Sequence, residues 1–198
     1  MKTSILKRLF LFLILFSLTL GLTGCQNTEQ TKSVQSFISG VAVADDAYKK
    51  SMGVAYMSMN LSENGKITTS EAYQQLEKCK ALLKKSRPDV KNLKIDDRVS
   101  QDEKKQMAHI QKGYLDMLDN GIIVIDGWMK YLNNGNLSTE MQTKLIKSEA
   151  KVDSSERFLH SDVTALAKKY DIKLPESFNK SKEEQALKMK SLIFPDVV

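Results

Sequence analysis

The stretch that decides the fold runs from residue 100 to 134 and reads SQDEKKQMAHIQKGYLDMLDNGIIVIDGWMKYLNN. Its apolar side chains recur at intervals of three and four residues, the period at which positions share one face of an α-helix. They are Met107, Ile110, Tyr114, Leu118, Ile122, Ile125, Met129 and Leu132. Ser100 followed by Glu103 forms a capping box, which marks a helix N-terminus. The sequence therefore predicts one long amphipathic helix.

One part of this helix, Asn120-Gly121 followed by Ile122 to Ile125, also has the composition of a turn and a short strand. The helical period nevertheless continues through Gly121 and Gly127. No other segment of the chain offers a partner strand. We therefore expect this part to be helical as well.

The same period predicts three further long helices. The first spans 33–59 and buries Val34, Phe37, Val41, Tyr48, Met52, Ala55 and Met59. The second begins at the capping box formed by Thr68 and Glu71 and ends near Ser86, before Arg87-Pro88. The last runs from the cap Ser138 to Tyr170.

A third capping box, Ser181 with Glu184, predicts a short C-terminal helix that contains Leu187, Met189, Leu192 and Ile193. Two loops with the same turn chemistry, 64–69 and 134–139, lie 70 positions apart, each after a long helix. This repetition predicts an all-α fold: an up-down four-helix bundle built from two helical hairpins over 33–174. The C-terminal segment is 175–198.

The N-terminus has the order of a secretory signal. Lys2, Lys7 and Arg8 precede an apolar run over 9–20, and Leu22-Thr23-Gly24-Cys25 closes the segment. This tetrapeptide resembles the lipobox of bacterial lipoproteins, a resemblance that covers residues 1–25 only. It implies removal of the signal peptide 1–24 and attachment of fatty acyl chains, such as palmitate, to Cys25. It also implies a lipid-anchored protein on the extracytoplasmic side of a bacterial cell membrane, with 25–32 as a lipidated tether.

The charge balance favours no nucleic-acid role. Loss of Lys2, Lys7 and Arg8 with the signal lowers the formal net charge from +6 to +3. Beyond Cys25, Cys79 is the remaining cysteine and falls in step with the apolar face of its helix, so we expect it to be buried.

Lysines and one arginine gather where two of the helices end: Lys84, Lys85, Arg87, Lys91 and Lys94, and Lys168, Lys169 and Lys173. Cations at helix C-termini are expected from the helix dipole. The alternative is a basic face that rests on anionic lipid.

Residues 60–71 resemble an EF-hand calcium loop. The ligands would be Asn60, Ser62, Asn64, the carbonyl of Lys66, and Glu71 at the twelfth position. Only Glu71 is negatively charged, which makes a weak site for a divalent cation. The same stretch is explained by a left-handed Gly65 and the Thr68–Glu71 capping box. The second loop keeps this turn chemistry but has Met141 at the twelfth position, so we expect a turn.

No residues form a recognisable catalytic or metal-binding set. His109 and His160 are expected near the level of Asp116 and Asp162, but two histidines without an i, i+4 partner make a poor metal site. Asp45 and Asp46 have no partner that suggests acid–base catalysis. We therefore expect no enzyme and no cofactor.

The sequence favours a non-enzymatic helical binding or assembly module, held at the membrane through Cys25 and directed at a protein or envelope partner. The alternatives are a weak calcium-responsive surface module at 60–71 and a small-ligand receptor of helical-bundle type.

Overall fold

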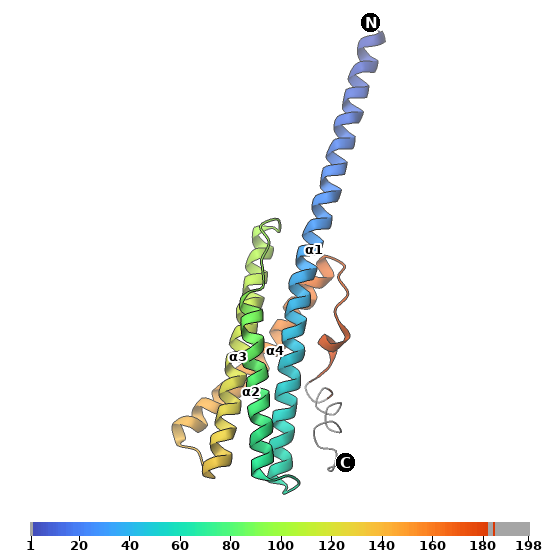
Figure 1. The fold of residues 1–198 in the computed structure, drawn as a ribbon. Coiled ribbons are helices and arrows are strands. Elements are labelled where there is room, and N and C mark those ends of the chain that lie inside the picture. The colour runs from blue at the N-terminus through green and yellow to red at the C-terminus, as the bar shows by residue number, and fades with distance from the viewer. Residues whose placement is uncertain (1, 182–183, 185–198) are drawn as a thin grey trace.

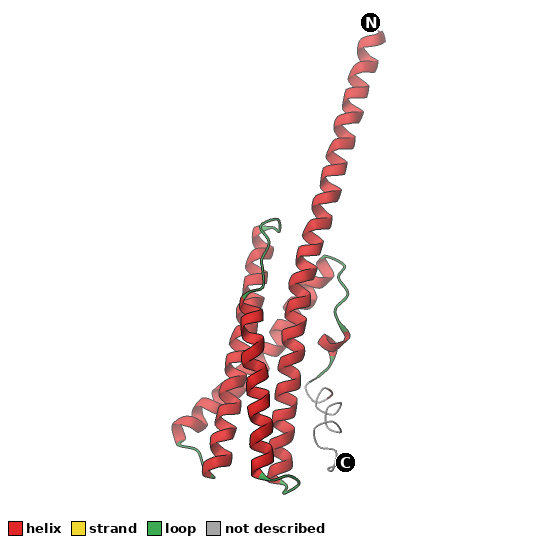
Figure 2. Ribbon diagram, viewed as in Figure 1, coloured by secondary structure: helices red, strands yellow, loops and turns green. Residues whose placement is uncertain are grey.

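The computed structural model describes residues 2–181 and 184, with side chains from residue 28 onward except Ser177. It contains four long helices: α1 (Lys2–Glu63), α2 (Thr69–Lys91), α3 (Gln101–Asn134) and α4 (Thr139–Lys169), followed by a 3₁₀ turn, η1 (Glu176–Asn179). Successive helices run in opposite directions and pack as neighbours (Figure 1). The described residues form helices and loops without a strand (Figure 2). The predicted all-α, up-down bundle is confirmed.

Helix α1 is longer than predicted. It is helical throughout Lys2–Glu63 and extends past the other three helices (Figure 1). Residues 26–32, most of the stretch expected to form a tether, belong to α1, because they contain neither proline nor glycine and the side chains of Glu29 and Gln30 contact the connection between α2 and α3. Among the described residues, no helix is both long enough and apolar enough to cross a membrane.

Helix α2 also continues beyond its predicted end. Pro88 lies inside its last turn, and the helix ends at Lys91. Tertiary contacts explain the extension, since Val90 is buried and Gln111 Nε2 donates hydrogen bonds to the carbonyls of Val90 and Lys91 at 2.8 and 3.1 Å. These contacts satisfy carbonyls that a helix C-terminus otherwise leaves without partners.

The three predicted capping boxes are all present. In the first two, Thr68 with Glu71 and Ser100 with Glu103, side chain and backbone bond reciprocally. Ser181 and Glu184 make the same pair of bonds at 2.8 and 3.1 Å. The apolar residues assigned to the helix beyond this third box lie outside the described residues. The turn η1 just before it was not predicted.

Glycines of α3 set how closely α4 packs. A Cβ atom at Gly113 would lie 2.4 Å from Leu159 Cδ2, and one at Gly127 would lie 2.3 Å from Leu145 Cδ1. The two glycines are 14 residues apart on α3, and the two leucines are 14 apart on the antiparallel α4. At Gly121, a Cβ would lie 3.2 Å from Leu83 of α2. The helical prediction across 120–127 is thus confirmed. Its glycines leave room for side chains of the neighbouring helices.

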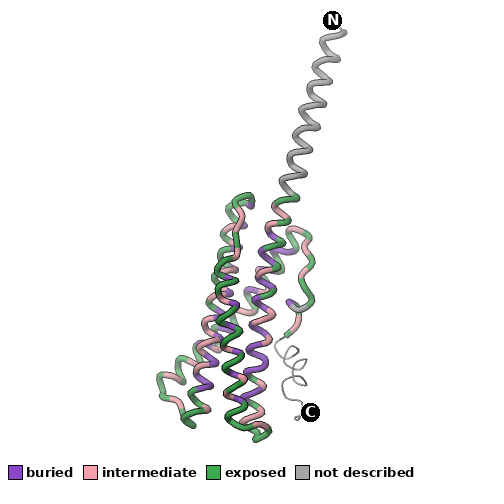
Figure 3. Tube along the Cα trace, in the orientation of Figure 1, coloured by how far each residue is buried: buried purple, intermediate pink, exposed green. Residues whose placement is uncertain are grey.

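The buried face of each helix points to one core (Figure 3), and the loops after α1 and α3 lie at the end far from the N-terminus (Figure 1). Both loops contain a glycine in the left-handed region, Gly65 at φ 65° and Gly135 at φ 71°. At the first loop, Gly65 and Lys66 donate to the carbonyls of Ser62 and Leu61, which is the Schellman arrangement. The predicted left-handed turn is confirmed.

Candidate functional site

The residues of the calcium-like stretch form helix ends. Asn60 and Ser62 lie within α1, and Asn64 Nδ2 donates to the carbonyl of Asn60 at 2.8 Å. Glu71 Oε2 accepts hydrogen bonds from the backbone and hydroxyl of Thr68 at 2.7 and 2.8 Å. These bonds lower the pKa of Glu71. Asn60 is therefore hydrogen-bonded to Asn64, and Glu71 to Thr68. The five candidate ligands lie at the end of α1, in the turn that follows it and at the start of α2.

The two histidines make different contacts. His109 is exposed, and its Nε2 lies 3.7 Å from Asp162 Oδ2. His160 is not fully solvated, because its ring stacks on Phe178 with 4.8 Å between centroids. Among the described residues, no group of three or more His, Cys, Asp or Glu side chains is placed to hold a metal ion. Cys79 is buried as predicted, and burial raises the pKa of its thiol to about 12.

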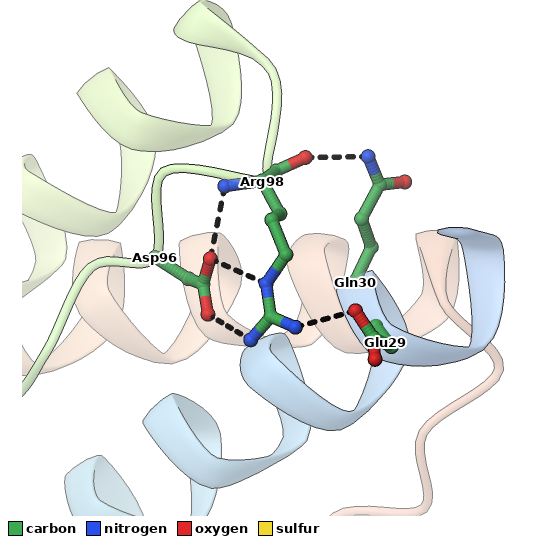
Figure 4. Close-up of polar contacts among 4 residues, drawn as sticks. All are labelled: Glu29, Gln30, Asp96 and Arg98. Atoms are coloured by element: carbon green, nitrogen blue, oxygen red, sulfur yellow. Dashed lines mark hydrogen bonds and ion pairs between the residues drawn. The ribbon is translucent and has the colours of Figure 1, made fainter. Parts of the chain in front are cut away.

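A polar junction joins the start of the bundle to the stretch that follows Cys25. Arg98, in the connection between α2 and α3, donates to Asp96 and to Glu29 of α1, while Gln30 donates to the backbone carbonyl of Arg98 (Figure 4). Arg98 lowers the pKa of Asp96 well below its usual range. Single exposed ion pairs contribute little, but a shared guanidinium fixes several groups at once. The junction therefore holds residues 29 and 30 against the bundle.

Next to this junction is an open cleft of about 720 Å³ where α1, the α2–α3 connection, α3 and the end of α4 meet. It is lined by Thr28, Gln30, Thr31, Lys32, Arg98, Val99, Ser100, Glu103, Lys169 and Tyr170. Most of the lining residues are polar or charged, and they include three cations, Lys32, Arg98 and Lys169. Two of these cations are already paired: Arg98 with Glu29 and Asp96, and Lys169 with Glu103.

Glu103 is the buried acid of this cleft. Its carboxylate accepts hydrogen bonds from Tyr170 at 2.5 Å and from the backbone of Ser100 at 2.8 Å, and it lies 2.6 Å from Lys169 Nζ. Burial opposes its ionisation, but the hydrogen bonds from Lys169, Tyr170 and Ser100 outweigh this and lower its pKa to about 2. Glu103 thus fixes the end of α4 to the start of α3 and is itself unavailable as a base.

A second polar group lies inside the core. Asp45 and Lys49, one turn apart on α1, form an ion pair at 2.8 Å with both side chains only 4% exposed. The hydroxyl of Tyr114 on α3 donates to Asp45 Oδ1 at 3.1 Å. Burial raises the pKa of Asp45, the charge of Glu156 adds to this, and the bonds from Lys49 and Tyr114 oppose it. Burial also raises the pKa of Tyr114 well above its usual value, so its hydroxyl stays a donor.

The chain after α4 closes over this buried pair. Lys49 Nζ donates to the carbonyl of Phe178 at 2.8 Å and lies 5.3 Å from the centre of the Phe178 ring. The same ring, which is fully buried, stacks on His160 of α4. Phe178 therefore occupies a position between α1 and α4, which we term the aromatic slot, bounded by Lys49 and His160.

Docking of Phe178 is close to energetic balance. Burial of a Phe side chain contributes about 1.5–3 kcal/mol, and a hydrogen bond to a charged group about 1.5–3 kcal/mol. Ordering the backbone costs about 1–2 kcal/mol per residue, and η1 has four residues. Gain and cost are of similar size, so docking of η1 depends strongly on the contacts of Phe178, to which the partly buried Ile172 and Leu174 add further burial.

Sequence reasoning missed this inner polar group, although a signal was present. The apolar face of α1 was followed from Val41 directly to Tyr48, a step of seven that passes over Asp45 at a core position. A carboxylate on an apolar face, with a lysine four residues later, indicates a buried ion pair. Phe178 had no comparable signal, because its partners lie on other helices.

Comparisons of the chain with family models, with curated proteins and with solved structures found no match. The functional argument therefore rests on the residues described above.

The pKa of Glu103 predicts an acid-sensitive contribution to stability. Because this pKa is lower in the folded chain than its ordinary value of 4.5, the contribution is complete above about pH 5 and is lost as the pH falls toward 2. We expect Glu103→Gln to lower the free energy of unfolding by about 1–3 kcal/mol at pH 7. Its deficit should shrink as the pH is lowered through this window.

Urea denaturation at several pH values measures this difference, with Glu77→Gln, an exposed glutamate of α2, as the matched control. A constant deficit from pH 7 to pH 2 would contradict the assignment.

The helix-end geometry of 60–71 predicts no specific calcium response. A ligand that binds only the folded chain must raise the melting temperature in a saturable way. We expect calcium, titrated to about 5 mM, the range of weak extracellular sites, to cause no saturable rise that depends on Glu71. Glu71→Gln should keep most of the cap, since Gln also serves at the third helical position. A saturable rise in the wild type that Glu71→Gln abolishes would establish an ion site instead.

Proposed function

We propose that this chain is a lipoprotein on the extracytoplasmic side of a bacterial cell membrane, anchored through Cys25, whose helical bundle is a non-enzymatic binding or assembly module. The observation that carries the proposal is the order of a basic start, an apolar run and Leu22-Thr23-Gly24-Cys25. Two or more acyl chains on Cys25 give stable membrane binding, where one chain gives only a transient one.

The polar junction supports a bundle that stands close to the membrane. Glu29 is four residues beyond Cys25, and Arg98 already ties it to the α2–α3 connection. A lipid-anchored chain with this junction has little free tether, so the cleft end faces the lipid headgroups. The loops that contain Gly65 and Gly135 then project away from the membrane.

Cations at the same end fit this orientation. Arg87 pairs with Asp119 and Lys169 with Glu103. Six further lysines on or near the ends of α2 and α4 are exposed: Lys84, Lys85, Lys91, Lys94, Lys168 and Lys173. Near an anionic leaflet each basic residue is worth about 1 kcal/mol. We propose that this end rests on anionic lipid while the opposite end meets a partner.

The interior polar groups support binding over catalysis. Asp45 is paired with Lys49 and accepts a hydrogen bond from Tyr114, and Lys49 donates to the carbonyl of Phe178, all inside the core. Glu103 is likewise engaged by three residues. Groups held in this way stabilise the fold rather than exchange protons with a substrate.

The anchor is tested by Cys25→Ser. The wild type should incorporate radiolabelled palmitate, sediment with membranes, and have a mature N-terminus at a lipid-modified Cys25 by mass spectrometry. The variant should lose the label and either keep its signal peptide or leave the membrane fraction. Cys79→Ala is the matched control, because it removes the chain's other cysteine and should behave as wild type. An unchanged label, mass and fractionation in Cys25→Ser would refute the lipid anchor.

A further inference from the structure

The aromatic slot is built largely by the helices and not by the segment that fills it. Lys49 is positioned by Asp45 one turn away on α1, and Asp45 is held by Tyr114 on α3. The other wall, His160, belongs to α4. Removal of Phe178 would leave the ion pair and the imidazole in place, with Lys49 able to donate to another carbonyl.

The segment that fills the slot has one fully buried side chain, Phe178, beside the partly buried Ile172 and Leu174, which also pack against the core. Of the residues 171–181 with described side chains, Phe178 alone is buried. Its amide donates to the carbonyl of Pro175 at 3.0 Å, so the ring is presented from a tight turn. At protein interfaces, a few buried anchors surrounded by weaker contacts carry most of the binding energy.

We propose that the aromatic slot is a recognition site for a partner peptide with an aromatic residue in a tight turn, and that Phe178 occupies it as an internal ligand. The slot supplies three matching features: Lys49 for the backbone carbonyl, the same cation for the ring face, and His160 for stacking. The partner displaces the C-terminal segment and makes the same contacts. This inference rests on the proposed binding role, but not on the lipid anchor.

A synthetic peptide of residues 172–181, IKLPESFNKS, tests the slot on the full chain in detergent. Phe178→Ala empties the slot, and this variant should bind the peptide at least tenfold more tightly than the wild type, which must first release its own segment. A peptide with Ala in place of the Phe should bind at least tenfold more weakly. Adding His160→Ala to Phe178→Ala should weaken binding, whereas His109→Ala, at an exposed histidine, should not.

Several outcomes would overturn the proposal. They are equal binding of the two peptides, and no binding at millimolar peptide to a folded Phe178→Ala chain. If Phe178→Ala does not fold, the test is made on the wild type by hydrogen–deuterium exchange. Millimolar peptide should displace the C-terminal segment and increase deuterium uptake over 175–181. Unchanged uptake would overturn the proposal. A wild-type dimer that Phe178→Ala abolishes would also overturn it, by making a second copy the occupant.

These results are independent of the anchor. If the peptide fails to bind but palmitate labelling is normal, the slot proposal is rejected and the lipid anchor stands. If the peptide binds to a chain that carries no palmitate, the lipid anchor is rejected and the slot proposal stands.

Discussion

Asp45 places a carboxylate at a core position of α1, and the packing around it follows from the need to keep that charge paired. Lys49 supplies the opposite charge, Tyr114 supplies a hydrogen bond from α3, and the carbonyl of Phe178 accepts from the lysine. Removal of one member of a buried pair costs about 3–5 kcal/mol, because the other charge is left without compensation. The hydrogen bond from Tyr114 to Asp45 therefore ties α1 to α3, and Lys49 provides the site at which the C-terminal segment docks.

This inner group and the cleft at the N-terminal end of the bundle have different tasks. Glu103, Lys169 and Tyr170 fasten the end of α4 to the start of α3, and Arg98 fastens the connection after α2 to α1. These contacts make a rigid end beside the proposed lipid anchor. The aromatic slot lies further along the bundle and is closed by one ring. In the proposed arrangement, the end of the bundle near the membrane is rigid, and the aromatic slot is where a partner peptide replaces Phe178.

Much of the fold was predictable because it depends on local sequence patterns, namely capping boxes and the helical period of apolar residues. The capping boxes at Thr68 and Ser100 correctly marked the starts of α2 and α3, and the unbroken period through Gly121 correctly identified one long α3. The end of α2 was not predictable in this way, because Gln111, more than twenty residues away from Pro88, supports the last turn. The site was less accessible still. Asp45 could have been found as a charge on an apolar face, but its bond to Tyr114 and the docking of Phe178 depend on long-range packing.

The central claim, that Asp45 and Lys49 act as one buried unit, is tested most directly by a double-mutant cycle. The free energies of unfolding of Asp45→Asn, Lys49→Met and the double variant would be compared with that of the wild type in urea. Each single change strands a buried partner, so the double variant should be more stable than the sum of the two losses predicts, by about 1–3 kcal/mol. Additivity within about 0.5 kcal/mol would show that the two residues do not depend on each other, and would contradict the account.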